Sequence, residues 1–286
     1  MKTRITLFIL GILLFAACKK EIKEARFKEN TFTTLSYNVA GLPEGINNDQ
    51  FPVKHIPLIS PRLNNYDIVC VQEDFNYHKE LIKDNHHPYK TTYYAREGSF
   101  GDGLNMFARF PILNFMRTTW NKCNGYDCFT PKGFTYSRVK LTPNAYIDVY
   151  NLHSNASVEP GDLAARRSNI LQLCNYIQFR SKDHAVIVMG DTNCRYTRSG
   201  DNIRELLALG FKDVWIEKER NGILPDANDI VVDGEVVDKI FYRSNELIQL
   251  IPLEYSLVTN NFLDNDGEWL SDHRPLYTRF QFNILK

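Results

Sequence analysis

The sequence has no excess of positive charge, no low-complexity run, no internal repeat and no linker rich in proline, serine or glycine. Without a linker or repeats, the 286 residues are best read as one folded domain, and a 43% hydrophobic composition can bury a substantial core. Lysine and arginine together number 34, and so do aspartate and glutamate. Proteins that bind nucleic acids usually carry a basic excess or stripe, so this balance disfavours a dedicated nuclease.

The first residues have the features of an export signal. A short basic region (residues 1–4) precedes an apolar run (residues 5–17) that ends in two alanines. Such a run is too short to span a membrane comfortably and is typical of a secretory signal. The two alanines followed by Cys18 resemble a bacterial lipobox, in which cleavage precedes a cysteine that becomes lipidated, with Phe15 where leucine is usual. An ordinary signal peptide with an incidental cysteine is the alternative.

These features divide the chain into a signal peptide at 1–17, a flexible tether at 18–30 and a folded domain at 31–286. Cleavage before Cys18 leaves 32 basic and 34 acidic side chains, so the mature protein is slightly acidic. We expect an exported, monomeric bacterial lipoprotein, held at a membrane by the lipid on Cys18, in the periplasm or at the cell surface.

Two cysteines fit this oxidising location. Cys123 and Cys128 lie five residues apart in a polar loop and could close a small disulfide. A metal site is the less favoured alternative, because no second pair of cysteines or histidines with zinc-like spacing follows. Cys70 and Cys174 lie in apolar surroundings and read as buried, small hydrophobic residues. The sequence assigns no role to Cys194.

Apolar and β-branched runs alternate with shorter helical patterns along the domain. Strands are predicted at 31–37, 66–72, 104–109, 112–118, 133–141, 145–153, 185–189, 236–242, 247–257 and 274–283. Helices are predicted at 77–83, 161–180 and 201–209, whereas 38–60 and 195–234 read as loops. Strand-rich sequence with intervening helices favours a mixed α/β sandwich.

Five polar clusters each lie at or next to a predicted strand end. They are Ser36-Tyr37-Asn38, Gln72-Glu73-Asp74, Leu152-His153-Ser154, Gly190-Asp191-Thr192-Asn193 and Ser271-Asp272-His273-Arg274-Pro275. Because α/β proteins collect their chemistry at strand ends, we expect these clusters to form one site. Carboxylates, amides and histidines in this combination suit a hard divalent cation and general acid–base catalysis.

Each cluster taken alone has an ordinary structural explanation. Glu73 could be a salt-bridged strand terminus, and Asn38 could belong to a turn. Asp191 and Asn193 are spaced to contact one ligand together, but a helix-capping turn would look the same. An acid beside His273 would hold its imidazole in one tautomer. The remaining histidines read as polar caps: His55, His78, His86, His87 and His184.

In their order and intervals, the five clusters resemble the endonuclease/exonuclease/phosphatase superfamily, whose members are related to pancreatic deoxyribonuclease. The resemblance runs from about Thr31 to the end of the chain. It implies a four-layered α/β/β/α sandwich of two mixed sheets flanked by helices, with a metal site at one rim of the sheets. It also implies a cofactor of one or two Mg²⁺ ions. Glu73 would be the principal ligand with Asn38 beside it, and Asp272 would be either a ligand or a carboxylate just outside the ligands.

The same resemblance assigns the catalytic residues. Asp191 and Asn193 match the pair that contacts the attacking water and the phosphate. Asp238 matches the strand aspartate that orients the catalytic histidine, and His273 matches that histidine, the general base. His153 matches the second histidine, which contacts the phosphate or assists the leaving group.

One segment narrows the branch of the superfamily. Residues 123–134 are similar to the cysteine–glycine–aspartate and lysine–glycine stretch of bacterial neutral sphingomyelinases. This similarity implies cleavage of a sphingophospholipid into ceramide and a phosphorylated head group. Two departures are His153-Ser154-Asn155 in place of His-Thr-Gln, and the absence from 195–261 of the long aromatic hairpin with which those enzymes insert into membranes.

Two other functions compete with this reading. A secreted nuclease or another phosphoesterase could use the same site, although the charge balance disfavours a nucleic-acid partner. An inactive surface lipoprotein would not need to keep every acid, amide and histidine of the site. The sequence leaves open the head group and the number of metal ions.

Overall fold

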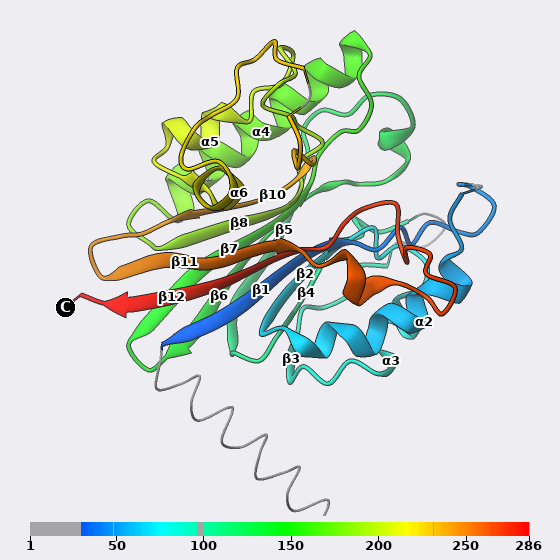
Figure 1. Ribbon diagram of the computed structural model, residues 1–286, viewed down its shortest axis with the longest axis horizontal. Coiled ribbons are helices and arrows are strands. Elements are labelled where there is room, and N and C mark those ends of the chain that lie inside the picture. The colour runs from blue at the N-terminus through cyan, green and yellow to red at the C-terminus, as the bar shows by residue number, and fades with distance from the viewer. Residues whose placement is uncertain (1–29, 48, 96–99, 231, 286) are drawn as a thin grey trace, which may run out of the picture.

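In the computed structural model, residues 30–47, 49–95, 100–230 and 232–285 are described, and they form two six-stranded sheets packed face to face (Figure 1). The first sheet contains, in spatial order, β11 (Ile248–Leu257), β12 (Leu276–Ile284), β1 (Thr31–Asn38), β2 (Ile68–Gln72), β4 (Asn105–Ala108) and β3 (Tyr89–Lys90). The second contains β5 (Ile112–Thr119), β6 (Gly133–Thr142), β7 (Ala145–His153), β8 (Val186–Asp191), β10 (Asp238–Arg243) and β9 (Lys212–Asp213).

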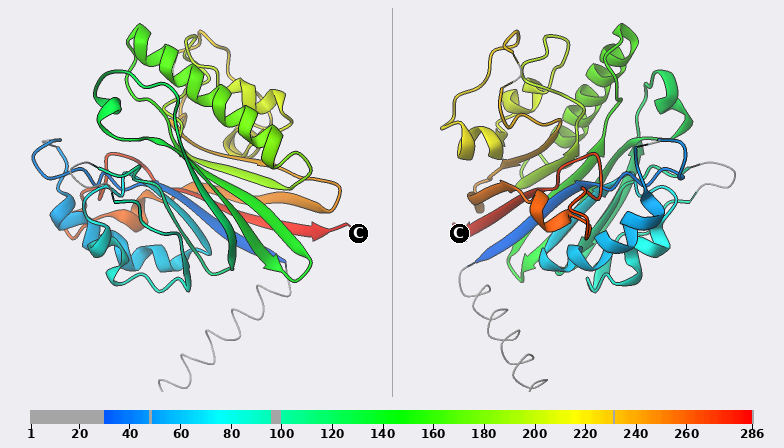
Figure 2. Two further views of the ribbon diagram at one scale, coloured as in Figure 1. Left: turned by 180° about the vertical axis from the view of Figure 1, so that it is seen from behind. Right: turned by 45° about the vertical axis from the view of Figure 1, so that its right-hand side comes forward.

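Helices cover the outer face of each sheet, as the two views of Figure 2 show. The first sheet is covered by α2 (Pro52–Arg62) and α3 (His78–Lys83), and the second by α4 (Pro160–Arg180), α5 (Arg204–Ala208) and α6 (Val214–Glu219). Three short 3₁₀ segments complete the described chain: η1 (Leu63–Asn65), η2 (Gly125–Phe129) and η3 (Thr259–Phe262). The predicted four-layered α/β/β/α sandwich is therefore confirmed.

Three apolar cores separate the four layers, one between the sheets and one under each group of helices. Because successive side chains of a strand point to opposite faces, one strand can contribute to two of these cores. On β8, Ile187 and Met189 point between the sheets, whereas Val186 and Val188 point toward α4. Strands buried on both faces read as continuous apolar runs, which is why they were recognisable in the sequence.

Two parallel strand pairs bring the polar clusters to one rim. β1 pairs in parallel with β2, and β7 with β8, so all four strands end at the same side of the sandwich. The register places Asn38 beside Gln72 and His153 beside Asp191, and antiparallel β10 starts with Asp238 beside Asp191. Helices α2 and α4 form the crossovers of the two parallel pairs.

The main difference from the sequence prediction lies between β1 and β2. The region 38–60 was predicted to be a loop, but Pro52–Arg62 forms helix α2, with Ile56 and Ile59 buried against the first sheet. Pro52 occupies the first turn, where a missing amide hydrogen is harmless, but Pro57 and Pro61 lie inside the helix and obscured its pattern. The predicted loop 195–234 also contains two short elements, β9 and α6.

Among the helices of the described residues, none combines the length and apolar character needed to cross a membrane. The predicted signal peptide, the lipidation site Cys18 and the tether up to residue 29 lie outside the described residues.

Candidate active site

The candidate site lies at the rim where the two sheets present their polar strand ends. β1 ends with Asn38, β7 with His153 and β8 with Asp191, whereas Glu73 directly follows β2 and Asp238 begins β10. These side chains come from both sheets, and His273 joins them from the loop before β12. The structure thus brings together six of the residues that the sequence singled out.

Asn38 connects the two sheets of the site. Its amide nitrogen donates hydrogen bonds to Glu73 Oε1 (3.0 Å) and Asp191 Oδ2 (3.2 Å), and its Oδ1 accepts from the Ala40 amide (3.1 Å). Glu73 adopts a left-handed backbone conformation (φ 58°), and its carbonyl accepts hydrogen bonds from Gly41 and Phe75. A strained turn of this kind persists only where surrounding contacts hold it, as these do.

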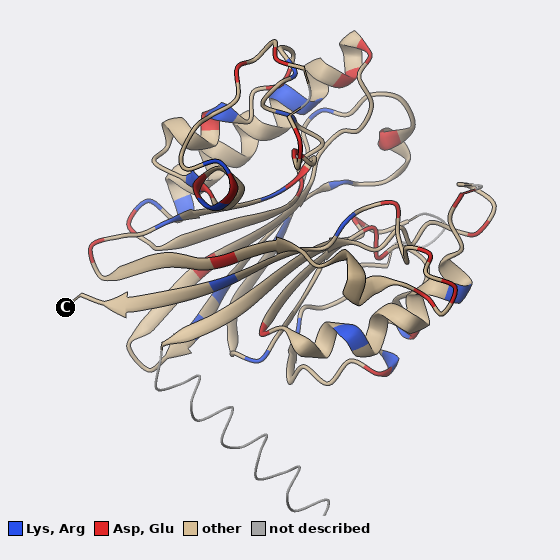
Figure 3. Ribbon diagram, in the orientation of Figure 1, with Lys and Arg blue, Asp and Glu red and all other residues tan. Residues whose placement is uncertain are grey.

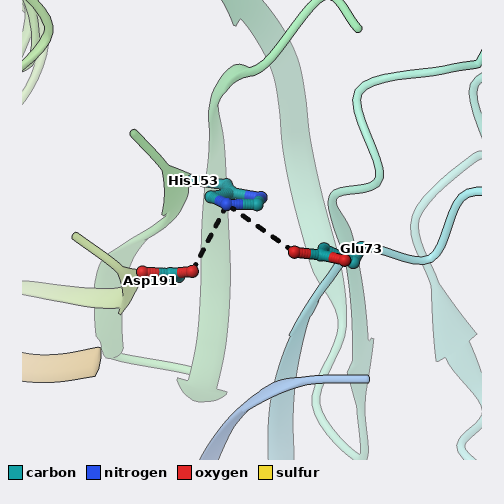
Figure 4. Close-up of side chains that lie close together, drawn as sticks. All are labelled: Glu73, His153 and Asp191. Carbon is teal, nitrogen blue, oxygen red and sulfur yellow. Dashed lines mark ion pairs between the residues drawn. The ribbon is translucent and has the colours of Figure 1, made fainter. Parts of the chain in front are cut away.

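The imidazole of His153 lies between two carboxylates (Figure 4). Its Nε2 is 3.3 Å from Asp191 Oδ2 and 3.9 Å from Glu73 Oε1. Lys132 also approaches this nitrogen, at 2.9 Å, and forms an ion pair with Asp127 at 2.5 Å. Lys132 was not predicted to belong to the site, although its segment, residues 123–134, was the signal in the sequence that could have revealed it.

His273 is held by an acid on one side and faces another. Its Nδ1 lies 2.7 Å from Asp238 Oδ2, and its Nε2 lies 3.7 Å from Asp191 Oδ2. The Ser271 hydroxyl fixes the preceding turn, since it donates to the Asn38 carbonyl (2.7 Å) and accepts from the His273 amide (3.1 Å). The contact with Asp238 thus orients the imidazole through Nδ1 and directs Nε2 toward Asp191.

Asn193 and Asp272 flank the assembled residues. The amide of Asn193 donates to Asp191 Oδ1 (2.9 Å), and its side chain donates to the Ser154 carbonyl (3.1 Å). Asp272 is exposed, and the two candidate metal clusters found in the described part of the chain do not include it. The ligand role predicted for Asp272 therefore remains a prediction.

Gly190, in the fourth polar cluster, lies where the backbones of β7 and β8 approach too closely for a side chain. A Cβ at this position would lie 2.2 Å from the Leu152 carbonyl oxygen, and the backbone has φ 147°. Any side chain would push β7 and β8 apart at the point where His153 and Asp191 meet.

Burial and charge move the pKa values of the site in different directions. Burial raises the pKa of Glu73, against the nearby Lys132 charge, and it raises the pKa of Asp191 to about 6. Burial, together with Lys132 and His273, holds the pKa of His153 well below its ordinary value. Burial opposes protonation of His273, but the charges of Asp238 and Asp191 outweigh it and raise its pKa well above the ordinary value. The surroundings thus favour the neutral form of His153 and the protonated form of His273.

The residues fit a divalent cation. Two groups bring their potential ligand atoms within 4.8 Å of one another: Glu73, His153 and Asp191, and Asp191, Asp238 and His273. Carboxylate and amide oxygens are the ligands that Mg²⁺ prefers. Burial raises the pKa of both Glu73 and Asp191, and a bound cation would favour their charged forms.

Residues 45–226 match the sequence profile described as "Endonuclease/Exonuclease/phosphatase family 2". The chain belongs to the endonuclease/exonuclease/phosphatase family. Sphingomyelinases of Mycobacterium bovis and Mycobacterium tuberculosis are 36% identical to it over 262 residues, which is 88% of this chain and 53% of theirs. The chain therefore spans about half the length of the curated relatives it matches.

Two solved structures share the fold. A beta toxin variant from Staphylococcus aureus, crystallised with magnesium ions, superimposes with a TM-score of 0.61 at 17% identity, covering 87% of this chain and 99% of the toxin. D. rerio TDP2 in complex with a single-strand DNA product gives a TM-score of 0.62 at 20% identity, covering 89% and 99%. At these identities the similarity establishes the two-sheet sandwich alone.

Cys123 and Cys128 are joined by a disulfide bond that closes the turn containing η2, with their Cα atoms 5.3 Å apart. Asp127, inside this disulfide loop, is the partner of Lys132. Through Lys132 the loop is thus linked to His153, a connection that the sequence does not suggest.

Proposed function

We propose that this protein is a Mg²⁺-dependent phosphodiesterase of the sphingomyelinase type, which cleaves the phosphorylated head group from a sphingophospholipid. The observation that carries the proposal is Lys132 placed against His153 inside a complete carboxylate–amide–histidine site. The 36% identity to mycobacterial sphingomyelinases over 88% of the chain supports the same substrate class.

Glu73 and Asn38, with Asp272 as a further candidate, would hold the magnesium ion. When bound, this ion supplies Lewis-acid polarisation of a phosphoryl oxygen and offsets negative charge in the transition state. Neutralisation of the carboxylates would also lower the pKa of His273 toward working pH, because part of its elevation comes from Asp191.

His273 is the proposed general base. Asp238 fixes Nδ1 at 2.7 Å, which leaves Nε2 to accept a proton from water. Asp191 and Asn193 would position that water, since Asp191 faces Nε2 of His273 and Asn193 is bonded to Asp191. His153, which also approaches Asp191 Oδ2, and the Lys132 ammonium would offer hydrogen bonds and positive charge to the phosphate or to the departing oxygen.

A nuclease is the second candidate, favoured by the shared fold of TDP2 with its DNA product. The distribution of charge argues against it. In the view of Figure 3, the lysines and arginines among the described residues are interspersed with aspartates and glutamates, and they form no continuous basic stripe leading to the rim. A nuclease would need such a surface to track phosphates.

One experiment separates the two functions. Protein beginning at Lys19 would be incubated with sphingomyelin vesicles and, in parallel, with plasmid DNA, each with Mg²⁺ or with chelator. Mg²⁺-dependent release of the head group with intact DNA supports the proposal. Nicked DNA with intact lipid would refute the proposal and support the nuclease function instead. His273→Ala protein serves as the catalytic control in both assays.

We also propose that the protein is exported and anchored through a lipid on Cys18, as a monomer. The apolar run at 5–17 supports export, and the two alanines before Cys18 support the lipid anchor. Expression in a bacterial host with a labelled fatty acid tests it. Label and membrane association should both be present in the natural chain and absent from Cys18→Ala, and a labelled Cys18→Ala protein would refute the anchor.

A further inference from the structure

The turn between β5 and β6 presents two aromatic side chains to solvent at the rim that carries the site. Tyr126 is 90% exposed and Phe129 is 70% exposed, and their ring centroids lie 6.3 Å apart. Figure 2 shows this turn projecting from the sandwich near the beginning of α4. Two neighbouring aromatic rings exposed to water do not contribute the hydrophobic stabilisation that buried aromatic side chains normally provide.

The turn is held rigidly, so the exposure is built into the fold. The disulfide closes it, and Asp127 pairs with Lys132. The Asn124 backbone amide donates a hydrogen bond to Asn155 Oδ1 (2.7 Å), and its side-chain amide donates one to Asp162 Oδ1 (2.8 Å) in the first turn of α4. With every polar anchor directed inward, the two rings are left facing outward.

We propose that the disulfide loop (residues 123–129) is a membrane-docking element whose Tyr126 and Phe129 enter the interface of a lipid bilayer and bring the rim onto its substrate. The proposal rests on the proposed function, because it assigns the loop to a lipid substrate. Tyrosine and phenylalanine suit this position, since aromatic rings partition into the boundary between head groups and acyl chains.

The charges around the loop favour a lipid surface. Among residues 120–132, Lys122 is an exposed cation, whereas the one carboxylate, Asp127, is partly buried and neutralised by Lys132. An exposed carboxylate would be repelled by phosphate groups, and an exposed lysine is attracted to them. The aromatic pair and Lys122 thus complement a phospholipid interface.

The loop also lies at the entrance to a cavity next to the site. A cavity of about 220 Å³ has Trp120, Asp127, Phe129 and Lys132 in its lining. Lys132 contacts His153 at 2.9 Å. A loop docked through Phe129 would therefore place lipid head groups beside this cavity and beside Lys132, which contacts His153.

The proposed anchor can reach the same membrane. β1 starts at the end of the sandwich opposite the rim (Figure 1) and its eight residues span about 26 Å. The 12 residues from Lys19 to Asn30 reach at most about 40 Å when extended. A chain tethered at Cys18 can therefore turn its rim toward the bilayer that holds its lipid.

The test compares vesicle binding by two variants of the protein that begins at Lys19, which keeps every core and site residue. The first is Tyr126→Ser/Phe129→Ser. The matched control is Phe179→Ser, because Phe179 is 87% exposed in the last turn of α4, away from the rim. Binding is measured by co-sedimentation in chelator, with vesicles of phosphatidylcholine alone and of phosphatidylcholine with sphingomyelin in equal parts.

The double variant should bind both vesicles at least about tenfold more weakly than the unsubstituted protein, which corresponds to about 1.4 kcal/mol. The control should bind normally. With Mg²⁺, the double variant should lose hydrolysis of vesicles but keep hydrolysis of a water-soluble, short-chain sphingomyelin, which also shows that it is folded. Equal vesicle binding by the double variant and the unsubstituted protein would overturn the docking role. Because binding is measured without catalysis, that result is distinguishable from failure of the proposed function.

Discussion

The two ends of the layer between the sheets have opposite characters. At the end far from the site, Phe32 on β1 and Ile187 on β8 point into an apolar core. At the rim, the same faces of the same strands present Asn38 and Asp191, which are hydrogen-bonded to each other. Burial of apolar surface stabilises the far end, whereas the rim concentrates buried polar groups that destabilise unless they are paired. Stability and chemistry are therefore separated along the strands.

Two histidines show the same contrast. His87 lies at the far end, where its Nε2 is 2.8 Å from the Tyr66 carbonyl oxygen, and burial lowers its pKa to about 4. His273 lies at the rim, where Asp238 and Asp191 raise its pKa well above the ordinary value despite burial. Burial and the charges of Arg109 and Lys90 outweigh the nearby acid, Asp67, and keep His87 neutral, whereas the two acids beside His273 favour its protonated form.

The largest expected effect is on turnover at the rim. His273→Ala should lower the rate of sphingomyelin hydrolysis by about 10²–10⁴-fold, because it removes the proposed general base. The thermal unfolding midpoint should remain close to that of the unsubstituted protein. His86→Ala, in an exposed loop, is the matched control and should leave the rate unchanged. A folded His273→Ala protein with normal turnover would exclude the assignment.

The complementary change at the far end should act on stability alone. Phe280 is fully buried and stacks on Phe32 with ring centroids 5.6 Å apart. Phe280→Ala should lower the free energy of unfolding by about 3–5 kcal/mol, measured by urea denaturation. The turnover number should be retained at temperatures where the variant is folded. A variant that is equally stable, or folded but inactive, would contradict the separation of the two ends.

The contrast between the histidines predicts a pH dependence. Because the folded-state pKa of His87 is about 4, below the ordinary value of 6.5, the unfolded state binds more protons between these pH values. Stability should therefore be present above pH 6.5 and be lost as the pH falls toward 4, by up to about 3 kcal/mol from this residue.

Urea denaturation at pH 7 and pH 4 measures this loss, and the His87→Gln variant isolates the contribution of His87. The difference in unfolding free energy between the two pH values should be smaller in the variant. An identical difference in the two proteins would show that His87 is not the group responsible.

The smallest effect concerns metal at the rim. A tenfold excess of Mg²⁺ over its dissociation constant should add about 1.4 kcal/mol to the free energy of unfolding, because only the folded chain assembles the ligands. The unfolding midpoint should rise by about 3–6 °C. In Glu73→Gln, which loses the proposed principal ligand, Mg²⁺ should produce little shift. A full shift of the unfolding midpoint in this variant would show that other residues bind the cation.

The sequence predicted the strands well because most are buried and therefore apolar. It failed for α2, where Pro57 and Pro61 interrupt the helical pattern and burial against the first sheet overrides them. It also failed to predict Lys132 as a residue of the site. A lysine that follows a polar loop normally reads as solvated, and its contact with His153 depends on how β6 and β7 pair.

By itself, the sequence determined which residues are available and where each strand stops. The polar clusters at strand ends, the apolar runs between them and the order of the motifs are local properties of the chain. Only the tertiary structure decided which side chains meet. Asn38 and Asp191 are separated by 153 residues and lie on different sheets, yet they are 3.2 Å apart. Such a distance depends on how two twisted sheets pack against one another, and no local pattern in the sequence encodes it.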